Sequence, residues 1–173
     1  MKRYLDELVL ADLSRKLVML TGPRQVGKTT LARQLMESLQ PAHYLNWDVA
    51  SDRAVLQRQS WPRTGRLLVL DEIHKMPGWK NWLKGVVDGR PANQALLVTG
   101  SARMETFRQS GESLAGRYFA FRLHPISVRE WCVQQRATPE AAPDVRQRCA
   151  GWNRAACRMR TRSWCRTRSS LRD

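Results

Sequence analysis

The chain has 173 residues, with 30 Lys and Arg against 15 Asp and Glu, a formal net charge of +15. Its length suits one domain with its own core and excludes a second full domain. No run approaches the roughly 20 apolar residues of a membrane span, and acidic Asp6 and Glu7 follow the first basic residues, so we expect no membrane partner, no signal peptide and a cytoplasmic location.

The first predicted strand leads into a glycine-rich loop. The apolar residues 17–20 precede Gly22–Thr29, whose sequence G-P-R-Q-V-G-K-T matches the pattern G-x-x-x-x-G-K-[ST]. Three leucines spaced four residues apart then predict a helix over residues 29–40, which Pro41 ends. The alternative is a chance match in a glycine-containing turn. Strand, loop and helix in this order favour a phosphate-binding loop.

Each residue type in this loop has a physical reason. Backbone N–H groups at a helix N-terminus bind phosphate, and Gly22 and Gly27 permit a tight path and a close approach to it. Lys28 would contact the β- and γ-phosphates, and Thr29 would offer its hydroxyl to Mg²⁺. The predicted nucleotide-binding residues are Gly22, Pro23, Arg24, Gln25, Val26, Gly27, Lys28, Thr29 and Thr30.

A second predicted strand, residues 42–48, ends near Asp48. Asp48 has two readings: a cap for the helix predicted over residues 49–59, which is the commoner role, or a partner of the phosphate site.

The third apolar run, residues 66–70, ends in Asp71 and Glu72. In an open α/β sheet, ligands bind beyond the carboxyl ends of the strands, so both carboxylates should lie near the loop. Asp71 would then bind or orient Mg²⁺, and Glu72 would polarise an attacking water. The alternative is a pair of acidic residues that only cap the next turn.

Further elements follow in order. Apolar residues between Trp79 and Val87 recur at helical spacing, so their tryptophans should belong to the core. A fourth strand, residues 94–99, places Thr99 and Ser101 as candidates to contact the γ-phosphate or the water, with turn formation as the alternative. Arg117, before a fifth strand over residues 118–123, either stabilises phosphoryl charge, in cis or across a subunit boundary, or is a surface residue. We assign none of the three histidines to catalysis.

Five motifs in this order carry a resemblance: T-G-P-R-Q-V-G-K-T-T, L-L-V-L-D-E-I-H-K, L-L-V-T-G-S-A-R, E-S-L-A-G-R and L-H-P-I-S-V-R-E-W. Together they resemble the bacterial and archaeal AAA-type P-loop ATPases usually described as predicted ATP-binding proteins, from the N-terminus to Trp131. The resemblance implies an α/β fold with a parallel five-stranded sheet, ATP and Mg²⁺ as ligands, and an assembly in which a neighbour lends an arginine. It also implies roles, with Gly22–Thr29 as Walker A, Asp71 and Glu72 as Walker B, Thr99 or Ser101 as the sensor, and Arg117 as the family's arginine.

The chain departs from the family pattern after Trp131, where members continue into a long C-terminal region. We therefore divide it into an ATPase core, residues 1–135, and a tail, residues 136–173, with 10 Arg, no Lys and 3 acidic residues. Three readings of the tail compete: an out-of-frame translation, a disordered charged tail, or an arm that binds nucleic acid. The four cysteines lack a C-x-x-C pair, so we expect free thiols rather than a zinc site.

The sequence thus predicts Mg²⁺-dependent ATP binding and hydrolysis, with Glu72, Arg117, Ser101 and Thr99 as catalytic candidates and Thr29 and Asp71 on the metal side. The alternatives are a nucleotide-binding module or truncated remnant without efficient turnover, and a DNA-associated ATPase. Besides ATP, the candidate partners are a second copy of the chain, in a homo-oligomer, and a nucleic acid.

Overall fold

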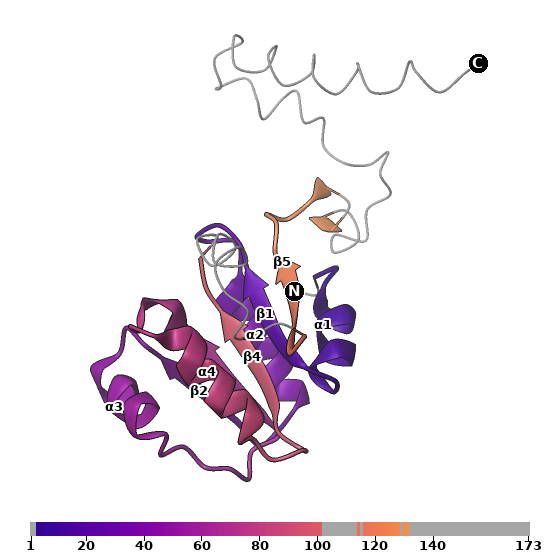
Figure 1. Ribbon diagram of the computed structural model, residues 1–173. Coiled ribbons are helices and arrows are strands. Elements are labelled where there is room, and N and C mark those ends of the chain that lie inside the picture. The colour runs from indigo at the N-terminus through magenta and orange to yellow at the C-terminus, as the bar shows by residue number, and fades with distance from the viewer. Residues whose placement is uncertain (1–2, 102–113, 115, 129, 132–173) are drawn as a thin grey trace, which may run out of the picture. The chain divides into compact units, whose positions relative to one another are not determined.

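The computed structural model describes residues 3–101, 114, 116–128 and 130–131. In these ranges helices and strands alternate (Figure 1). The helices are α1 (Asp6–Leu13), α2 (Lys28–Ser38), α3 (Ala50–Arg58), the short 3₁₀ helix η1 (Ile73–Lys75) and α4 (Trp79–Asp88). The strands are β1 (Leu17–Thr21), β2 (Ala42–Asn46), β3 (Leu67–Asp71), β4 (Ala95–Thr99) and β5 (Tyr118–Arg122).

The five strands form one parallel sheet in the order β2-β3-β4-β1-β5. Parallel neighbours need crossover connections, and a helix lies between most consecutive strands here. The expected parallel five-stranded α/β fold is therefore confirmed, and each of the five predicted strands is present with its bounds shifted by at most two residues.

The core consists of two apolar layers, one on each face of the sheet. Successive side chains of a strand point to opposite faces, so Leu17 and Met19 of β1 join the layer under α3 and α4, whereas Val18 and Leu20 join the layer under α1 and α2 (Figure 1). Every residue of β1 and β3 is buried. Near-continuous apolar runs are the pattern of strands covered on both faces, and such strands hold their carboxyl ends rigidly.

Helix α1 is an addition to what the sequence led us to expect. Its buried residues Val9 and Leu13 follow the buried Leu5 at intervals of four, which is helical spacing. Exposed Leu8 and Leu10 obscure that spacing in the sequence. Helix α4 was predicted, and its tryptophans do belong to the core: Trp79 is buried, and Trp82 packs against the same layer.

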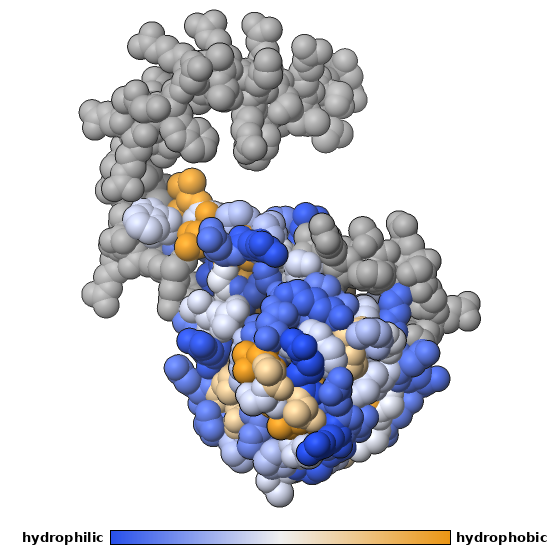
Figure 2. Space-filling view, turned by 90° about the vertical axis from the view of Figure 1, so that its left-hand side faces the viewer, coloured by the Kyte–Doolittle hydropathy of each residue, from blue (hydrophilic) through white to orange (hydrophobic). Residues whose placement is uncertain are grey.

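Few large apolar side chains are exposed in the described ranges. On the face in Figure 2, hydrophilic residues predominate among those that are coloured, with apolar side chains in small groups. The exposed large hydrophobic residues in the described ranges are Tyr4, Leu8, Leu10, Val49, Ile126, Val128 and Trp131. None of the helices in those ranges is long and apolar enough to cross a membrane.

Candidate active site

Strand register brings the predicted polar residues to one edge of the sheet. Asn46 of β2 pairs with Asp71 of β3, and Asp71 pairs with Thr99 of β4. Thr99 in turn pairs with Leu20 of β1, one residue before Thr21, where the glycine-rich loop begins. The carboxyl ends of four strands thus meet where the sequence analysis expected a ligand.

The loop between β1 and α2 folds around the side chain of Lys28. The Lys28 ammonium donates to the carbonyls of Gly22 at 2.9 Å and Pro23 at 2.7 Å. Gln25 and Gly27 have φ of 63° and 95°, in the left-handed region that is easiest for glycine. Burial lowers the pKa of Lys28, against the opposing effects of Glu72 and then Asp71. The ammonium therefore lies in the electrostatic field of both carboxylates.

A glycine is required at position 22 because the backbone after the adjacent strand β5 lies against it. It has φ of 153°, and a Cβ placed on it would lie 2.4 Å from the backbone oxygen of Leu123, just after β5. Backbone cannot move aside as a flexible side chain does, so the start of the loop is locked against the end of β5. This contact adds a third reason for the glycine to the tight path and the phosphate approach expected from the sequence.

Gly22→Ala is accordingly expected to cost about 2–4 kcal/mol of unfolding free energy, because it combines a clash with strain. Gly78→Ala is the matched control: Gly78 has φ of 69° but nothing within 4 Å of its added Cβ, so only the left-handed penalty of about 1 kcal/mol applies. Denaturant unfolding of both variants measures the difference. Equal losses would show that the contact with Leu123 is unimportant.

Asp71 is held by hydroxyl groups on both of its oxygens. Thr99 Oγ1 donates to Asp71 Oδ1, and the Tyr44 hydroxyl donates to Asp71 Oδ2. Asp71 is 6% exposed and Thr99 is fully buried. Burial, and then the hydrogen bond to Asp71, raise the pKa of Tyr44, while a hydrogen bond with Thr29 lowers it. Tyr44 thus connects Thr29 and Asp71, the two predicted metal-side residues.

This arrangement changes the role of Thr99. A hydroxyl has one proton to donate, and Thr99 donates its proton to Asp71. Its side chain therefore orients the carboxylate, while Ser101 Oγ lies 3.3 Å from His74 Nε2.

Glu72 immediately precedes η1 and has a left-handed conformation, with φ of 55°. Such backbone is uncommon for a residue with a Cβ and is concentrated at functional sites. Its carboxylate lies 3.1 Å from Lys75 Nζ, and Lys75 also pairs with Asp48. The hydrogen bond to Asp48 is the main cause of the raised pKa of Lys75. Asp48 is thus linked to Glu72 through Lys75. The predicted helix cap is not formed, because Val49 is at the N-cap position of α3 and no side-chain cap is present there.

His74 approaches the same carboxylate oxygen of Glu72 as Lys75 does. Its Nε2 is 3.8 Å from Glu72 Oε2 and 3.3 Å from Ser101 Oγ. Burial lowers the pKa of His74, against the effect of Glu72, and its buried Nδ1 has no hydrogen-bond partner among the described residues. We assigned no histidine to catalysis, but His74 links the two catalytic candidates Glu72 and Ser101.

Arg117 lies away from this edge. It immediately precedes Tyr118, which pairs with Leu17 at the start of β1, so the length of β1, roughly 13 Å at about 3.3 Å per residue, separates Arg117 from the loop. It forms an ion pair with Asp88 at 2.9 Å, at the end of α4. The structure therefore does not bring Arg117 together with the other site residues of its own chain.

A pocket of about 430 Å³ adjoins the loop on the side of α2. Its wall includes the apolar residues Val26, Leu31, Pro125 and Ile126 and the polar residues Arg3 and Gln34. Arg24, Gln25, Gly27 and Thr30 of the predicted binding set also line it. The loop thus has Asp71 and Glu72 near its lysine and a partly apolar pocket beside it.

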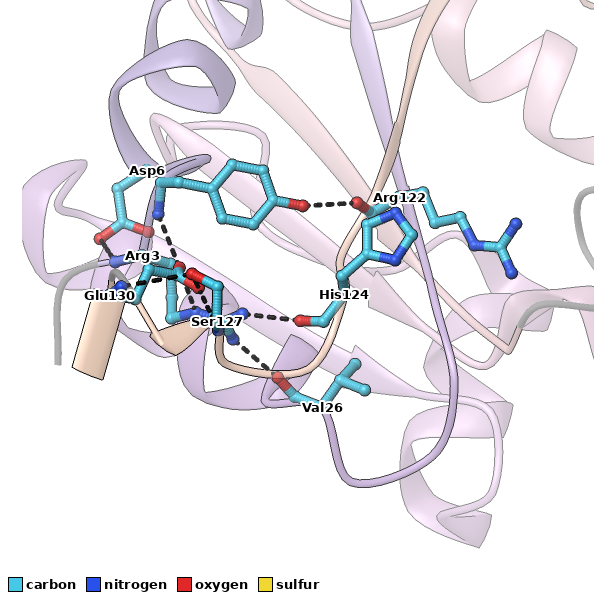
Figure 3. A network of polar contacts seen from close by, with 8 residues as sticks. Arg3, Asp6, Val26, Arg122, His124, Ser127 and Glu130 are labelled. Carbon is cyan, nitrogen blue, oxygen red and sulfur yellow. Dashed lines mark hydrogen bonds and ion pairs between the residues drawn. The ribbon is translucent and has the colours of Figure 1, made fainter. Parts of the chain in front are cut away.

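Arg3, in the wall of this pocket, belongs to a buried ion pair that the sequence did not predict. Arg3 Nε lies 2.9 Å from Glu130 Oε1, and the two side chains are 6% and 9% exposed (Figure 3). The other two arms of the guanidinium donate to the carbonyls of Val26, at 2.8 Å, and His124, at 2.7 Å. Nothing in the one-dimensional sequence relates residues 127 positions apart.

Protonation of Glu130 is expected to lower the free energy of unfolding in acid. Burial alone would raise its pKa, but hydrogen bonds from Ser127, Arg3 and Tyr4 outweigh burial and lower it from 4.5 to about 2. A carboxyl group whose pKa is lower in the folded state than in the unfolded state stabilises the folded state above pH 4.5, here by about 3 kcal/mol. This contribution is lost as the pH falls from 4.5 toward 2. Unfolding free energy between pH 5 and 3 should fall more steeply for the native chain than for Glu130→Gln, and equal slopes would contradict the assignment.

Comparisons with known proteins agree with this fold. A family model described as an AAA domain matches residues 14–132. Two uncharacterized mycobacterial proteins, Mb2031c of Mycobacterium bovis and Rv2008c of Mycobacterium tuberculosis, are each 35% identical over 116 residues, which are 65% of this chain and 26% of the relative. The chain thus spans about a quarter of the length of these relatives.

Two solved structures of RuvB from Thermotoga maritima are similar in fold. A point variant superimposes with a TM-score of 0.51 at 24% identity, and a structure described as a Holliday junction branch migration motor does so with 0.50 at 26%. Each comparison covers 72% of this chain and 45% of the RuvB chain. The chain belongs to the AAA domain family, and its fold is that of an AAA-type P-loop ATPase.

Proposed function

We propose that the chain binds ATP with Mg²⁺ and hydrolyses it by attack of water on the γ-phosphoryl group. The observation that carries the proposal is the meeting of Lys28, Asp71 and Glu72 where β1 and β3 end. Lys28 would exchange its present acceptors, the carbonyls of Gly22 and Pro23, for β- and γ-phosphate oxygens.

The residues present fit a magnesium ion. In the described part of the chain no group of three or more His, Cys, Asp or Glu could hold a metal alone, and Mg²⁺ in nucleotide sites needs only one or two protein ligands besides phosphate and water. Asp71 accepts one hydrogen bond on each oxygen and so keeps free lone pairs on both. The Thr29 side chain is hydrogen-bonded to the hydroxyl of Tyr44, which also donates to Asp71. When bound, Mg²⁺ would neutralise charge on the phosphates.

Glu72 is the group proposed to polarise the attacking water. Lys75 and His74 both approach Glu72 Oε2, and Ser101 lies against His74. The proposal is supported by the place of Glu72 directly after the metal-side Asp71 and by its left-handed backbone, a conformation that is concentrated at functional sites.

The pocket beside the loop is proposed for the base and ribose. Its volume of about 430 Å³ is within the usual range for small-ligand sites. Val26, Leu31 and Pro125 offer apolar surface to a base, and Gln34 offers an amide that can hydrogen-bond to its edge.

Arg117 would contribute from a second copy of the chain, since it lies at the opposite edge of its own sheet. This placement supports a homo-oligomer as the active form. It also leaves a second candidate, nucleotide binding without efficient turnover, because a chain with no second copy beside it has no arginine at the site from this position.

A nucleic acid partner remains an expectation. RuvB is described as a branch migration motor, but the arginine-rich residues 136–173 on which we based this expectation lie outside the described ranges.

The test is phosphate release from ATP by the full chain over a range of protein concentrations, with Mg²⁺ and with EDTA. Release that requires Mg²⁺ and rises more than proportionally with protein concentration would support hydrolysis by an oligomer. ATP binding without release at any concentration would favour the second candidate. Absence of ATP binding would contradict both.

A further inference from the structure

Arg3 connects three segments that are far apart in the sequence. Its guanidinium bonds to the phosphate loop at Val26, to the segment after β5 at His124, and to Glu130 (Figure 3). Burial of a charged group is costly unless it is paired and hydrogen-bonded. All three nitrogens of this guanidinium donate to an oxygen at 2.7–2.9 Å, so the side chain has little freedom to move.

The bond to Val26 has a geometric consequence for the loop. A peptide unit is planar and trans, so its C=O and N–H groups point in opposite directions. Arg3 fixes the Val26 carbonyl toward itself, and the N–H of Gly27 must therefore point away from Arg3. Gly27 immediately precedes α2, where loop N–H groups bind phosphate. Arg3 also lies close to Gly27, since a Cβ there would be 3.5 Å from Arg3 Nη1.

Glu130 in turn fixes Arg3. Glu130 Oε2 accepts from the N–H and the hydroxyl of Ser127, and the Glu130 N–H donates back to Ser127 Oγ at 3.2 Å. This reciprocal pattern is a capping box at the start of a helical turn. The other oxygen, Oε1, accepts from Arg3 Nε and from the N–H of Tyr4 at 3.1 Å. One carboxylate therefore joins the Ser127 turn to the N-terminal segment.

We propose that Arg3, anchored by Glu130, is a positioning residue that presents the Gly27 N–H to the phosphates of the nucleotide and couples nucleotide binding to the Ser127–Glu130 turn. The inference rests on the proposed function. Coupling of this kind is reciprocal, so nucleotide binding also tightens the turn and the N-terminal segment. A purely structural ion pair would stabilise the fold without any selective effect on the loop.

Four variants of the full chain separate these cases. Arg3→Ala removes the clamp. Arg3→Lys keeps the charge but loses the fork that bonds three oxygens at once. Glu130→Gln keeps the shape and weakens the anchor. Tyr4→Phe is the matched control, since it removes only the hydroxyl bond from the same segment to the carbonyl of Arg122, which does not involve the loop.

The first measurement is amide hydrogen exchange in ligand-free protein. Arg3→Ala should accelerate amide exchange of residues 26–28 about tenfold and leave exchange in β3 and β4 unchanged. Arg3→Lys should show the same acceleration as Arg3→Ala. Tyr4→Phe should exchange as the native chain does. Unchanged exchange in the loop, or acceleration spread evenly over β3 and β4, would overturn the proposal. If Arg3→Ala does not fold, Glu130→Gln decides in the same way, with a smaller selective acceleration expected.

The second measurement is equilibrium ATP affinity with Mg²⁺. Arg3→Ala should weaken binding about 10- to 100-fold and Glu130→Gln about 3- to 10-fold, with Tyr4→Phe unchanged. A folded Arg3→Ala protein that binds ATP as the native chain does would overturn the clamp and leave the proposed function intact. A native chain that binds no ATP would overturn the proposed function and the nucleotide coupling together, and loop exchange would still show whether Arg3 fixes the loop.

Discussion

Replacing Lys28 with Ala is expected to lower ATP affinity at least about 100-fold, or close to 3 kcal/mol. Lys28 Nζ lies among the loop carbonyls of Gly22 and Pro23 and in the field of Asp71 and Glu72. Its removal would leave those carboxylates to repel the phosphates without a compensating charge. Isothermal titration with ATP and Mg²⁺ measures the loss.

Lys84→Ala is the matched control for this experiment. Lys84 is an exposed residue of α4, so the variant removes the same side chain and the same charge away from the loop. Its ATP affinity should equal that of the native chain. Equal losses in the two variants would indicate a general charge effect and would contradict a specific phosphate contact by Lys28.

The second large effect is expected at Glu72. Glu72→Gln should keep ATP affinity within about threefold and lower turnover about 10²- to 10⁴-fold, the range of a general base. Glutamine has the same shape and places no new demand on the left-handed backbone at this position. The lost pairing with Lys75 is partly solvent-exposed and should cost little stability.

Glu37→Gln, an exposed position on α2, is the control for the charge change and should turn over ATP as the native chain does. A fall in affinity that matches the fall in turnover would mean that Glu72 acts in binding. That result would remove the distinction between the two carboxylates.

The fold could be predicted from the sequence because its signals are local. The buried strands β1 and β3 are continuous apolar runs, and α2 shows its apolar stripe directly. Helix α1 was missed because Leu8 and Leu10 are apolar and exposed, which hides the four-residue spacing of the buried positions.

Only those site residues that are adjacent in the sequence, or that lie at the ends of neighbouring strands, could be predicted. Asp71 and Glu72 follow directly from the strand that carries them. Tyr44 could not be predicted, because its role depends on the register between β2 and β3 and on its hydroxyl reaching Asp71. His74 and Lys75 follow Glu72 in the sequence, but only the turn of η1 returns their side chains to its carboxylate.

The Arg3–Glu130 pair could not be predicted at all, since it joins residues at opposite ends of the described chain. Single-sequence patterns contain no signal for such a contact beyond the S-x-x-E spacing of Ser127 and Glu130. For Arg117 the sequence pattern misled: its residue type and its order along the chain fitted a catalytic role. Arg117 precedes the amino end of β5, however, whereas the other site residues lie at the carboxyl ends of the strands.

The most direct test of the account is a paired measurement of ATP binding and Mg²⁺-dependent ATP hydrolysis in the native chain and in Glu72→Gln. The account predicts binding in both proteins and turnover in the native chain alone. Equal turnover in the two proteins would contradict the mechanism, because the carboxylate beside Asp71 would then have no part in the attack of water.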